Sequence, residues 1–263
     1  MIQIHKYPRT HHIEGSRLQP GDEDLDSMAF EQIKGRYVVI EEKMDGANSG
    51  VSFSETGKLQ LQSRGHYLSG GPREKHFDLF KTWANVHVQA LQEVLGSRYV
   101  MYGEWLYAKH TMYYNDLPHY FMEFDVLDTD NGQFLSTHRR QEMLGQLGCV
   151  VPVKVLFEGK LTRKEQLSAL LTPSFFIRKG HIEELRQRAA DMGLRADQVV
   201  YETDPSELME GLYIKVEEAG EVKERYKFVR ADFLTTVLHA QSHWLNRPII
   251  PNLLAEGVDI FVP

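Results

Sequence analysis

Short runs of hydrophobic residues alternate with polar ones along the first half of the chain. Five segments rich in β-branched and aromatic residues lie between Gly, Asn or Asp residues: Tyr37–Glu41, Ser49–Phe53, Lys58–Gln62, Tyr99–Trp105 and Tyr120–Leu127. Segments of this kind are typical of strands. Two further strands are expected at Gly211–Glu217 and Glu224–Val229, joined as a hairpin across residues 218–221. The pattern predicts an antiparallel sheet.

Apolar residues at three- and four-residue spacing predict helices between and after these strands. The expected helices are Phe77–Leu95, Thr137–Leu147, Arg163–Leu171, His181–Met192 and Ala231–Leu245. Ser136 or Thr137 is expected to cap the second of them. Pro248 and Pro251 then end regular structure, and the apolar tail 249–263 is expected to pack back on the body. This order of elements indicates the α+β class, with strands building the walls of a site.

Composition and charge narrow the possible functions. The chain has 263 residues, of which 42% are hydrophobic and 25% charged, as in ordinary globular proteins. Its net charge of −7 gives no global attraction to nucleic acid, so a polyanion has to be bound by a local basic site. Cys149 is the only cysteine, which excludes an intramolecular disulfide and favours a reducing compartment. With no signal peptide or membrane-length apolar run, we expect a cytoplasmic protein without a membrane partner.

Lys43 stands at the end of an apolar strand and is followed at once by an Asp45-Gly46 turn. A lysine held under a partly apolar roof loses hydration, and nearby cations lower its pKa further. Part of its population is then neutral and nucleophilic near pH 7. The alternative is a surface lysine beside a hairpin turn, and four positions are too few to decide between the two.

Six short segments, spread in order from Glu42 to Lys227, favour the interpretation of Lys43 as a nucleophile over that of a surface lysine. They are Glu-Lys-Met-Asp-Gly-Ala-Asn at 42–48, Ser-Arg-Gly at 63–65, Tyr-Gly-Glu-Trp at 102–105, Glu-Phe-Asp-Val at 123–126, Glu-Gly-Leu-Tyr-Ile-Lys at 210–215 and Arg-Tyr-Lys at 225–227. Together they resemble the motifs of the covalent nucleotidyltransferase superfamily, most closely ATP-dependent RNA ligases of the bacteriophage RNA ligase 2 type. The resemblance implies an α+β nucleotidyltransferase fold, similar to ATP-grasp, with antiparallel sheets flanked by helices.

The resemblance also implies the catalytic groups. Lys43 is expected to be the nucleophile that becomes bonded to AMP, with Lys215 and Lys227 as further catalytic lysines at the α-phosphate. These cations would also lower the pKa of Lys43 by like-charge repulsion. Glu210 is the expected metal-directed carboxylate, because Mg²⁺ or Mn²⁺ takes few protein oxygens beside substrate phosphates.

Roles in binding follow in the same way. Phe124 is expected to stack on adenine, and Glu104 to accept a hydrogen bond from a ribose hydroxyl. Glu42 would help to recognise the base. The complete expected ATP-binding set is Glu42, Lys43, Asn48, Arg64, Glu104, Phe124, Lys215 and Lys227. The expected contacts to the RNA ends are Asn48, Arg64 and Arg225.

Two positions depart from the family pattern. Arg225 stands where the last motif usually has a lysine; its charge is kept, but its fork geometry differs. Asp45 stands where relatives of RNA ligase 2 often have His, and Asp is the commoner choice in DNA ligases and capping enzymes. The second departure weakens the assignment to RNA.

Only 36 residues follow Lys227, which is too few for the OB-fold domain of DNA ligases and capping enzymes. We therefore expect an adenylyltransferase domain at 1–230, a short helical extension packed on it at 231–263, and no OB domain. A catalytic domain with only this short extension is expected to bind nucleic acid weakly or to depend on an accessory RNA-repair protein for binding.

The expected activity is an ATP-dependent RNA ligase. It would join 5′-phosphate and 3′-hydroxyl ends of RNA through a lysyl-AMP intermediate and an AMP-capped 5′ end. The alternatives are a DNA ligase or a GTP-dependent RNA capping guanylyltransferase. An inactive nucleotide-binding sensor of RNA ends is the alternative that is not an enzyme.

Overall fold

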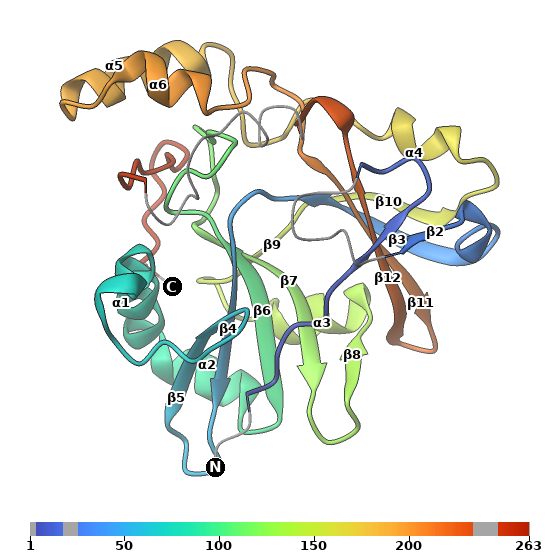
Figure 1. The fold of residues 1–263 in the computed structure, drawn as a ribbon. Coiled ribbons are helices and arrows are strands. Elements are labelled where there is room, and N and C mark those ends of the chain that lie inside the picture. Colours follow the sequence, from blue (N-terminus) through green and yellow to red (C-terminus); the bar gives the residue numbers. More distant parts are fainter. Residues whose placement is uncertain (1–3, 18–25, 234–246, 263) are drawn as a thin grey trace.

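Strands dominate the computed structural model, which describes residues 4–17, 26–233 and 247–262. Within this part of the chain the sheet runs in the order β10-β3-β11-β12-β8-β7-β6-β4-β5, with β1, β2 and β9 paired off this path (Figure 1). The strands are β1 His11–Ile13, β2 Ser27–Met28, β3 Tyr37–Lys43, β4 Ala47–Phe53, β5 Leu59–Ser63, β6 Tyr99–Trp105, β7 Phe121–Asp128, β8 Gln133–Leu135, β9 Val151–Pro152, β10 Val155–Lys160, β11 Gly211–Glu218 and β12 Glu221–Val229. Most neighbours are antiparallel, as predicted.

The helices are short. They are η1 Phe30–Gln32, η2 Pro72–Phe77, α1 Asp78–Val86, α2 Val88–Leu95, α3 Thr137–Leu144, α4 Glu165–Ala169, α5 His181–Asp191 and α6 Ala196–Tyr201. The single helix predicted over 77–95 is divided at His87, whose ψ of 13° leaves the helical range and whose Nε2 lies 2.9 Å from the Ile260 carbonyl oxygen. Ser136 caps α3 as predicted. The helix expected at Ala231–Leu245 lies largely outside the described residues.

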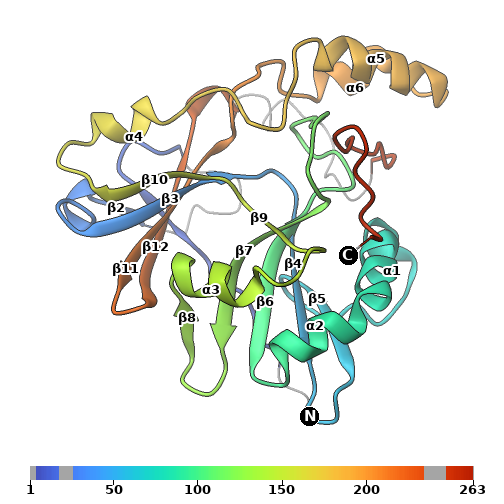
Figure 2. The same cartoon turned by 180° about the vertical axis from the view of Figure 1, so that it is seen from behind.

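Two hydrophobic cores pack against different parts of the sheet. Helices α1, α2 and α3 cover strands β4–β7 and share a core that includes Trp83, Leu91 and Phe121; Figure 2 shows α2 and α3 in front of these strands. Helix α4 contributes Leu167 to a second core under β3 and β11. Successive strand residues point to opposite faces. The face of these strands turned away from the cores, here called the inner face, carries the charged residues Glu41, Lys43, Lys215, Arg225 and Lys227.

The tail 247–262 packs on the body, as expected. Ile250 and Ile260 are buried, and the Lys109 N–H donates to the Ile250 carbonyl oxygen at 2.8 Å. The described part of the tail has no helix. Among the described residues, no helix is both long and apolar enough to cross a membrane.

Gly103 in β6 is required by the packing of an aromatic core. A Cβ atom at this position would lie 2.5 Å from Cζ of Phe121 and 2.8 Å from the Met122 carbonyl oxygen. The Phe121 ring cannot retreat, because it stacks on Phe80 and Trp83 at centroid distances of 5.4 and 5.1 Å. We predict that Gly103→Ala lowers the free energy of unfolding by about 1–3 kcal/mol.

Chemical denaturation of the two glycine variants tests this prediction. Gly65→Ala is the matched control, because a Cβ there meets nothing within 4 Å. Equal stabilities of Gly103→Ala and Gly65→Ala would contradict the packing argument.

Buried His119 links stability to pH. Burial lowers its pKa to about 4, and its Nδ1 accepts the Phe121 N–H at 2.9 Å. An unfolded histidine has a pKa of about 6.5, so between about pH 6.5 and 4 the unfolded chain binds a proton that the folded state does not. Stability is therefore lost as the pH falls through this window, by up to about 3 kcal/mol.

The stability profile of His119→Leu tests this linkage. We expect a shallower fall in the free energy of unfolding between pH 6.5 and 4 than in the unmodified protein. His138→Leu, at a histidine whose side chain is 87% exposed, serves as the control. Identical slopes in all three proteins would refute the assignment.

Candidate active site

Lys43 is the last residue of β3, and its partner in β11 is Gly211. This register brings Glu210 beside it, with Oε1 2.6 Å from Nζ of Lys43. Burial by itself lowers the pKa of Lys43, but the charges of Glu210, Glu104 and Asp45 outweigh it and hold the pKa above its ordinary value. The expected lowering of the Lys43 pKa by a ring of cations is therefore wrong, because acidic side chains surround this ammonium.

The Asp45-Gly46 turn fixes the geometry next to Lys43. Oδ2 of Asp45 accepts the N–H groups of Thr111 and Met112, both at 2.7 Å. A Cβ atom on Gly46 would lie 2.9 Å from Cγ of Glu104, and the Gly46 N–H is hydrogen-bonded to the Glu104 carboxylate. The turn thus needs both residue types, one to hold the 111–112 loop and one to admit Glu104.

Glu104 faces Asn48 across the β4–β6 pair. Burial, reinforced by Glu210 and Asp45, raises the pKa of Glu104 to about 8 against the opposing charge of Lys43. The Asn48 Oδ1 atom is buried and has no hydrogen-bond partner in the described part of the chain. Buried polar atoms are normally paired. An uncharged carboxyl group beside an unpaired amide oxygen therefore fits a site that a polar ligand completes.

Arg64 and Lys227 approach this region from two other strands. Arg64 follows β5 directly and is exposed; Ser63 pairs with Ser49, which places Arg64 beside Asn48 in the sheet order. Lys227 pairs with Tyr213 and lies on the inner face. The structure thus brings Lys43, Glu210 and Glu104 into one cluster, with Arg64 and Lys227 on the strands around it.

Phe124 lies among aromatic side chains. One of them, Tyr213, is not among the site residues that the sequence predicts. The Phe124 ring is half-buried and packs edge-on against Tyr7, at a centroid distance of 5.2 Å. Tyr213 lies 6.1 Å away. Tyr213 belongs to the segment 210–215, and its place in β11 on the same face as Lys215 was the available signal.

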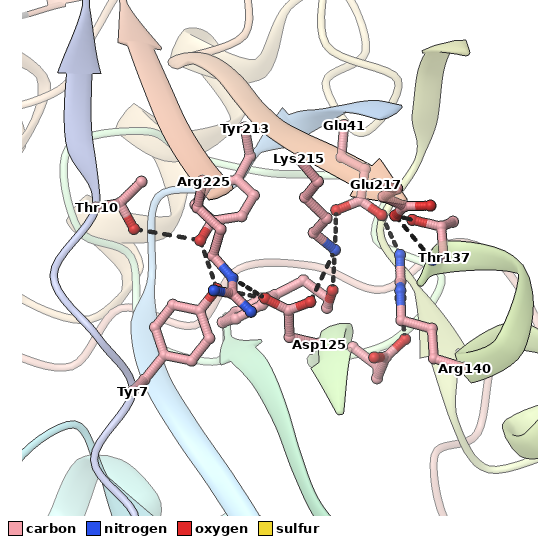
Figure 3. Close-up of polar contacts among 12 residues, drawn as sticks. Tyr7, Thr10, Glu41, Asp125, Thr137, Arg140, Tyr213, Lys215, Glu217 and Arg225 are labelled. Atoms are coloured by element: carbon pink, nitrogen blue, oxygen red, sulfur yellow. Dashed lines mark hydrogen bonds and ion pairs between the residues drawn. The ribbon is translucent and has the colours of Figure 1, made fainter. Parts of the chain in front are cut away.

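Lys215 lies between two acidic side chains on the inner face. Its ammonium is fully buried, 2.9 Å from Oε2 of Glu41 and 3.2 Å from Oδ1 of Asp125 (Figure 3). It also donates to the Phe124 carbonyl oxygen. The two carboxylates neutralise this cation, and its ion pairs join β11 to β3 and β7. Its contact with the α-phosphate stays a prediction.

Arg225 contacts the same acidic residue, Asp125, and its expected contact with RNA ends stays a prediction. Its Nε donates to Oδ2 of Asp125 at 3.0 Å, and its guanidinium lies 3.7 Å from the centroid of the Phe134 ring. Its side chain is only 12% exposed. The planar fork of arginine suits stacking and pairing of this kind, which the usual lysine does not provide.

Arg140 completes this buried network from α3. It donates to Glu41 and to Glu123, and all three side chains are buried. At the other end Tyr7, from the N-terminal segment, donates to Asp125 at 2.5 Å and contacts the Tyr213 hydroxyl (Figure 3). No local pattern in the sequence points to Arg140, because its partners lie on distant strands.

Glu42 points away from the inner face. Its carboxylate accepts the Ser174 hydroxyl at 2.5 Å and the Phe175 N–H at 3.4 Å. Burial raises its pKa to about 7. Because neighbouring strand residues point to opposite faces, Glu42 faces away from Lys43 and holds the 174–175 loop. Its expected contact with the base stays a prediction.

Among the described residues, no group of three or more His, Cys, Asp or Glu side chains is arranged to hold a metal ion. Glu210 remains as a buried carboxylate beside Lys43. Such a site suits a cation that takes one or two protein carboxylates and fills its other positions with water and phosphate oxygens, as Mg²⁺ does.

Removal of Arg140 tests the network. Arg140→Ala would leave the buried carboxylates of Glu41 and Glu123 without this partner, and we predict a loss of about 3–5 kcal/mol in the free energy of unfolding. Arg139→Ala is the matched control, since Arg139 is exposed and its change is expected to stay within about 0.5 kcal/mol. Equal denaturation midpoints for the two variants would count against the network.

Comparisons with known proteins identify the fold and the family. Solved structures of the Naegleria gruberi RNA ligase are similar in fold at 18% sequence identity: a variant with ATP and Mn has a TM-score of 0.52 over 80% of this chain and 53% of that one, and a variant with AMP and Mn has 0.56 over 90% and 59%. The form with PPi has a TM-score of 0.50 over 88% of this chain and 57% of that one.

The chain thus spans little more than half the length of these matched proteins. A search of curated proteins finds no match. The model of the family described as RNA ligase matches residues 36–229, which is most of the chain and contains all six motifs. This protein belongs to the RNA ligase family.

Proposed function

We propose that the protein is an ATP-dependent RNA ligase whose nucleophile is Lys43. The Lys43 amine attacks the α-phosphorus of ATP, a P–N bond forms, and pyrophosphate leaves. AMP then passes to a 5′-phosphate of RNA, and a 3′-hydroxyl attacks that phosphate, closes the phosphodiester bond and releases AMP. The observation that carries the proposal is the cluster of Lys43, Glu210 and Glu104 within the segment matched by the RNA ligase family.

Lys43 has to lose a proton before it can attack. Oε1 of Glu210, 2.6 Å from Nζ, is the nearest acceptor for that proton. Lys227 and Arg64 are the cations proposed to bind the phosphates. A divalent cation, for which Glu210 is the proposed protein ligand, would neutralise phosphate charge when bound.

The remaining residues position the nucleoside. Glu104, with a pKa of about 8, carries a proton near pH 7 and can donate to or accept from a ribose hydroxyl. The unpaired Oδ1 of Asn48 accepts a further hydrogen bond at the same place. Phe124, which is half-buried, supplies an aromatic face for adenine. ATP and Mn²⁺ or Mg²⁺ are the proposed cofactors, since the Naegleria gruberi structures hold ATP or AMP with Mn.

Two broader assignments belong to the same proposal. We assign residues 1–230 to the adenylyltransferase domain and 231–263 to an extension packed on it. A cytoplasmic setting agrees with the single cysteine, Cys149, which is free and buried. An accessory RNA-repair protein would supply grip on RNA if the isolated chain binds it weakly.

Mass spectrometry after incubation with ATP tests the nucleophile. We expect one added AMP on the peptide that contains Lys43, and complete loss of this adduct in Lys43→Ala. Lys34→Ala, at an exposed lysine of the same part of the chain, is expected to keep it. The adduct should be acid-labile, as a P–N bond is.

The same assay separates the alternative functions. A protein adduct from GTP alone would indicate a capping guanylyltransferase, and the absence of any nucleotide adduct would indicate a non-catalytic sensor. Sealing of DNA ends in preference to RNA ends would indicate a DNA ligase. Each of these outcomes would overturn the assignment as an RNA ligase.

A further inference from the structure

We propose that Phe175 and Lys154 form a stacking platform for an unpaired nucleobase of the RNA strand, on the face of β3 opposite to Lys43. The inference rests on the proposed function and deepens it, because it assigns an RNA contact outside the inner face. None of the six motifs contains either residue. The argument uses the exposure of the ring, its attachment to Glu42 and the position of the Lys154 ammonium.

Phe175 is 54% exposed, although Ser174 and Phe176 on either side of it are buried. The loop is firmly attached. The Ser174 N–H donates to the Glu207 carbonyl oxygen at 2.8 Å, and the Phe176 carbonyl oxygen accepts the N–H groups of Asn115 and Asp116. Hydrogen bonds therefore fix the backbone on both sides of Phe175, and its ring is exposed although the loop is ordered.

Glu42, the residue before the proposed nucleophile, is hydrogen-bonded to the backbone of both Phe175 and Lys154. Its carboxylate accepts the Phe175 N–H and the Ser174 hydroxyl, and its own N–H donates to the Lys154 carbonyl oxygen at 2.9 Å. Glu42 directly precedes Lys43 in β3. The platform is thus anchored one residue from the group that carries AMP in the proposed reaction.

The chemistry of the pair matches single-stranded nucleic acid. Nζ of Lys154 lies 5.2 Å from the centroid of the Phe175 ring, and Lys154 is exposed. Aromatic faces stack on bases of any sequence, and adjacent cations bind the backbone phosphates. Arg178 and Lys179, both exposed, follow in the same segment. With a net charge of −7, the protein needs such local cations to hold a polyanion.

The adenine of ATP is a less suitable occupant than an RNA base. Glu42 and the loop it holds lie on the opposite face of β3 from Lys43. The proposed nucleoside contacts, Glu104 and Phe124, come from β6 and β7. An RNA strand whose end reaches Lys43 can pass over the end of β3 to Phe175, because a polynucleotide extends well beyond the reacting phosphate.

Fluorescence anisotropy with a labelled single-stranded RNA, without ATP, tests the platform. We expect Phe175→Ala to raise the Kd about 5- to 150-fold, as loss of one stacked base does. Phe175→Trp should keep the affinity, whereas Phe175→Leu, which retains apolar bulk without a ring, should lose it. Phe261→Ala, at another exposed phenylalanine, is the control.

Two further measurements sharpen the assignment. Abasic nucleotides placed singly along the RNA should weaken binding to the unmodified protein at one position, and should cause no additional loss at that position in Phe175→Ala. Lys154→Ala should reduce the slope of log affinity against log salt by about one. Phe175→Ala or Phe175→Leu binding RNA as tightly as Phe261→Ala would overturn the proposal.

Adenylylation by ATP, measured in parallel, keeps the two proposals separable. RNA binding without nucleotide does not depend on the Lys43 adduct, so absence of that adduct would refute the ligase assignment alone. Weaker adenylylation of Phe175→Ala with intact RNA binding would place the ring in the nucleotide site, and that result also overturns the platform.

Discussion

The buried charge network on the inner face is the interaction on which the rest of the structure depends. Removing an ion from water costs several kcal/mol, and its partners offset this only when they meet in a fixed geometry. The network members come from β3, β7, β11, β12 and α3: Glu41, Glu123, Asp125, Arg140, Lys215 and Arg225. Their pairing therefore fixes how these elements sit together. Lys43, two residues beyond Glu41 on the same strand face, takes its position from this arrangement.

Charge pairing also determines the protonation state of Lys43. Lys43 is held as an ammonium by Glu210, and the nearby charge of Asp45 also favours its protonated form. This state is stable and is not nucleophilic. In the proposed reaction Glu210, which pairs with the Lys43 ammonium, also lies next to the sites of the phosphates and of the divalent cation. Binding of the nucleotide with its cation would therefore change the charges around Glu210 and, by the same change, favour loss of the proton from Lys43.

Close packing explains much of the short motifs. A Cβ atom on Gly46 would lie 2.7 Å from the Trp105 carbonyl oxygen, and one on Gly211 would lie 2.1 Å from the Phe228 carbonyl oxygen. The first glycine lets the turn after Lys43 meet Glu104, and the second lets β11 bring Glu210 against Lys43. Part of each motif is thus a packing requirement that holds the chemical residues of the other motifs in place. The motifs occur together because each one needs the others to form the site.

The sequence by itself determined the strands at 37–53 and 99–128, the β11–β12 hairpin and the lysine at the end of β3, because these depend on local alternation, turn residues and six short ordered segments. Tertiary structure alone decided which charges meet. Lys215 and Arg225 sit in the same segments as Glu210 and Lys227, yet register and strand twist direct them to Asp125. Arg140, and the loop that presents Phe175, come from segments without any motif. Charge partners across a sheet depend on contacts between distant strands, which local patterns of residues do not encode.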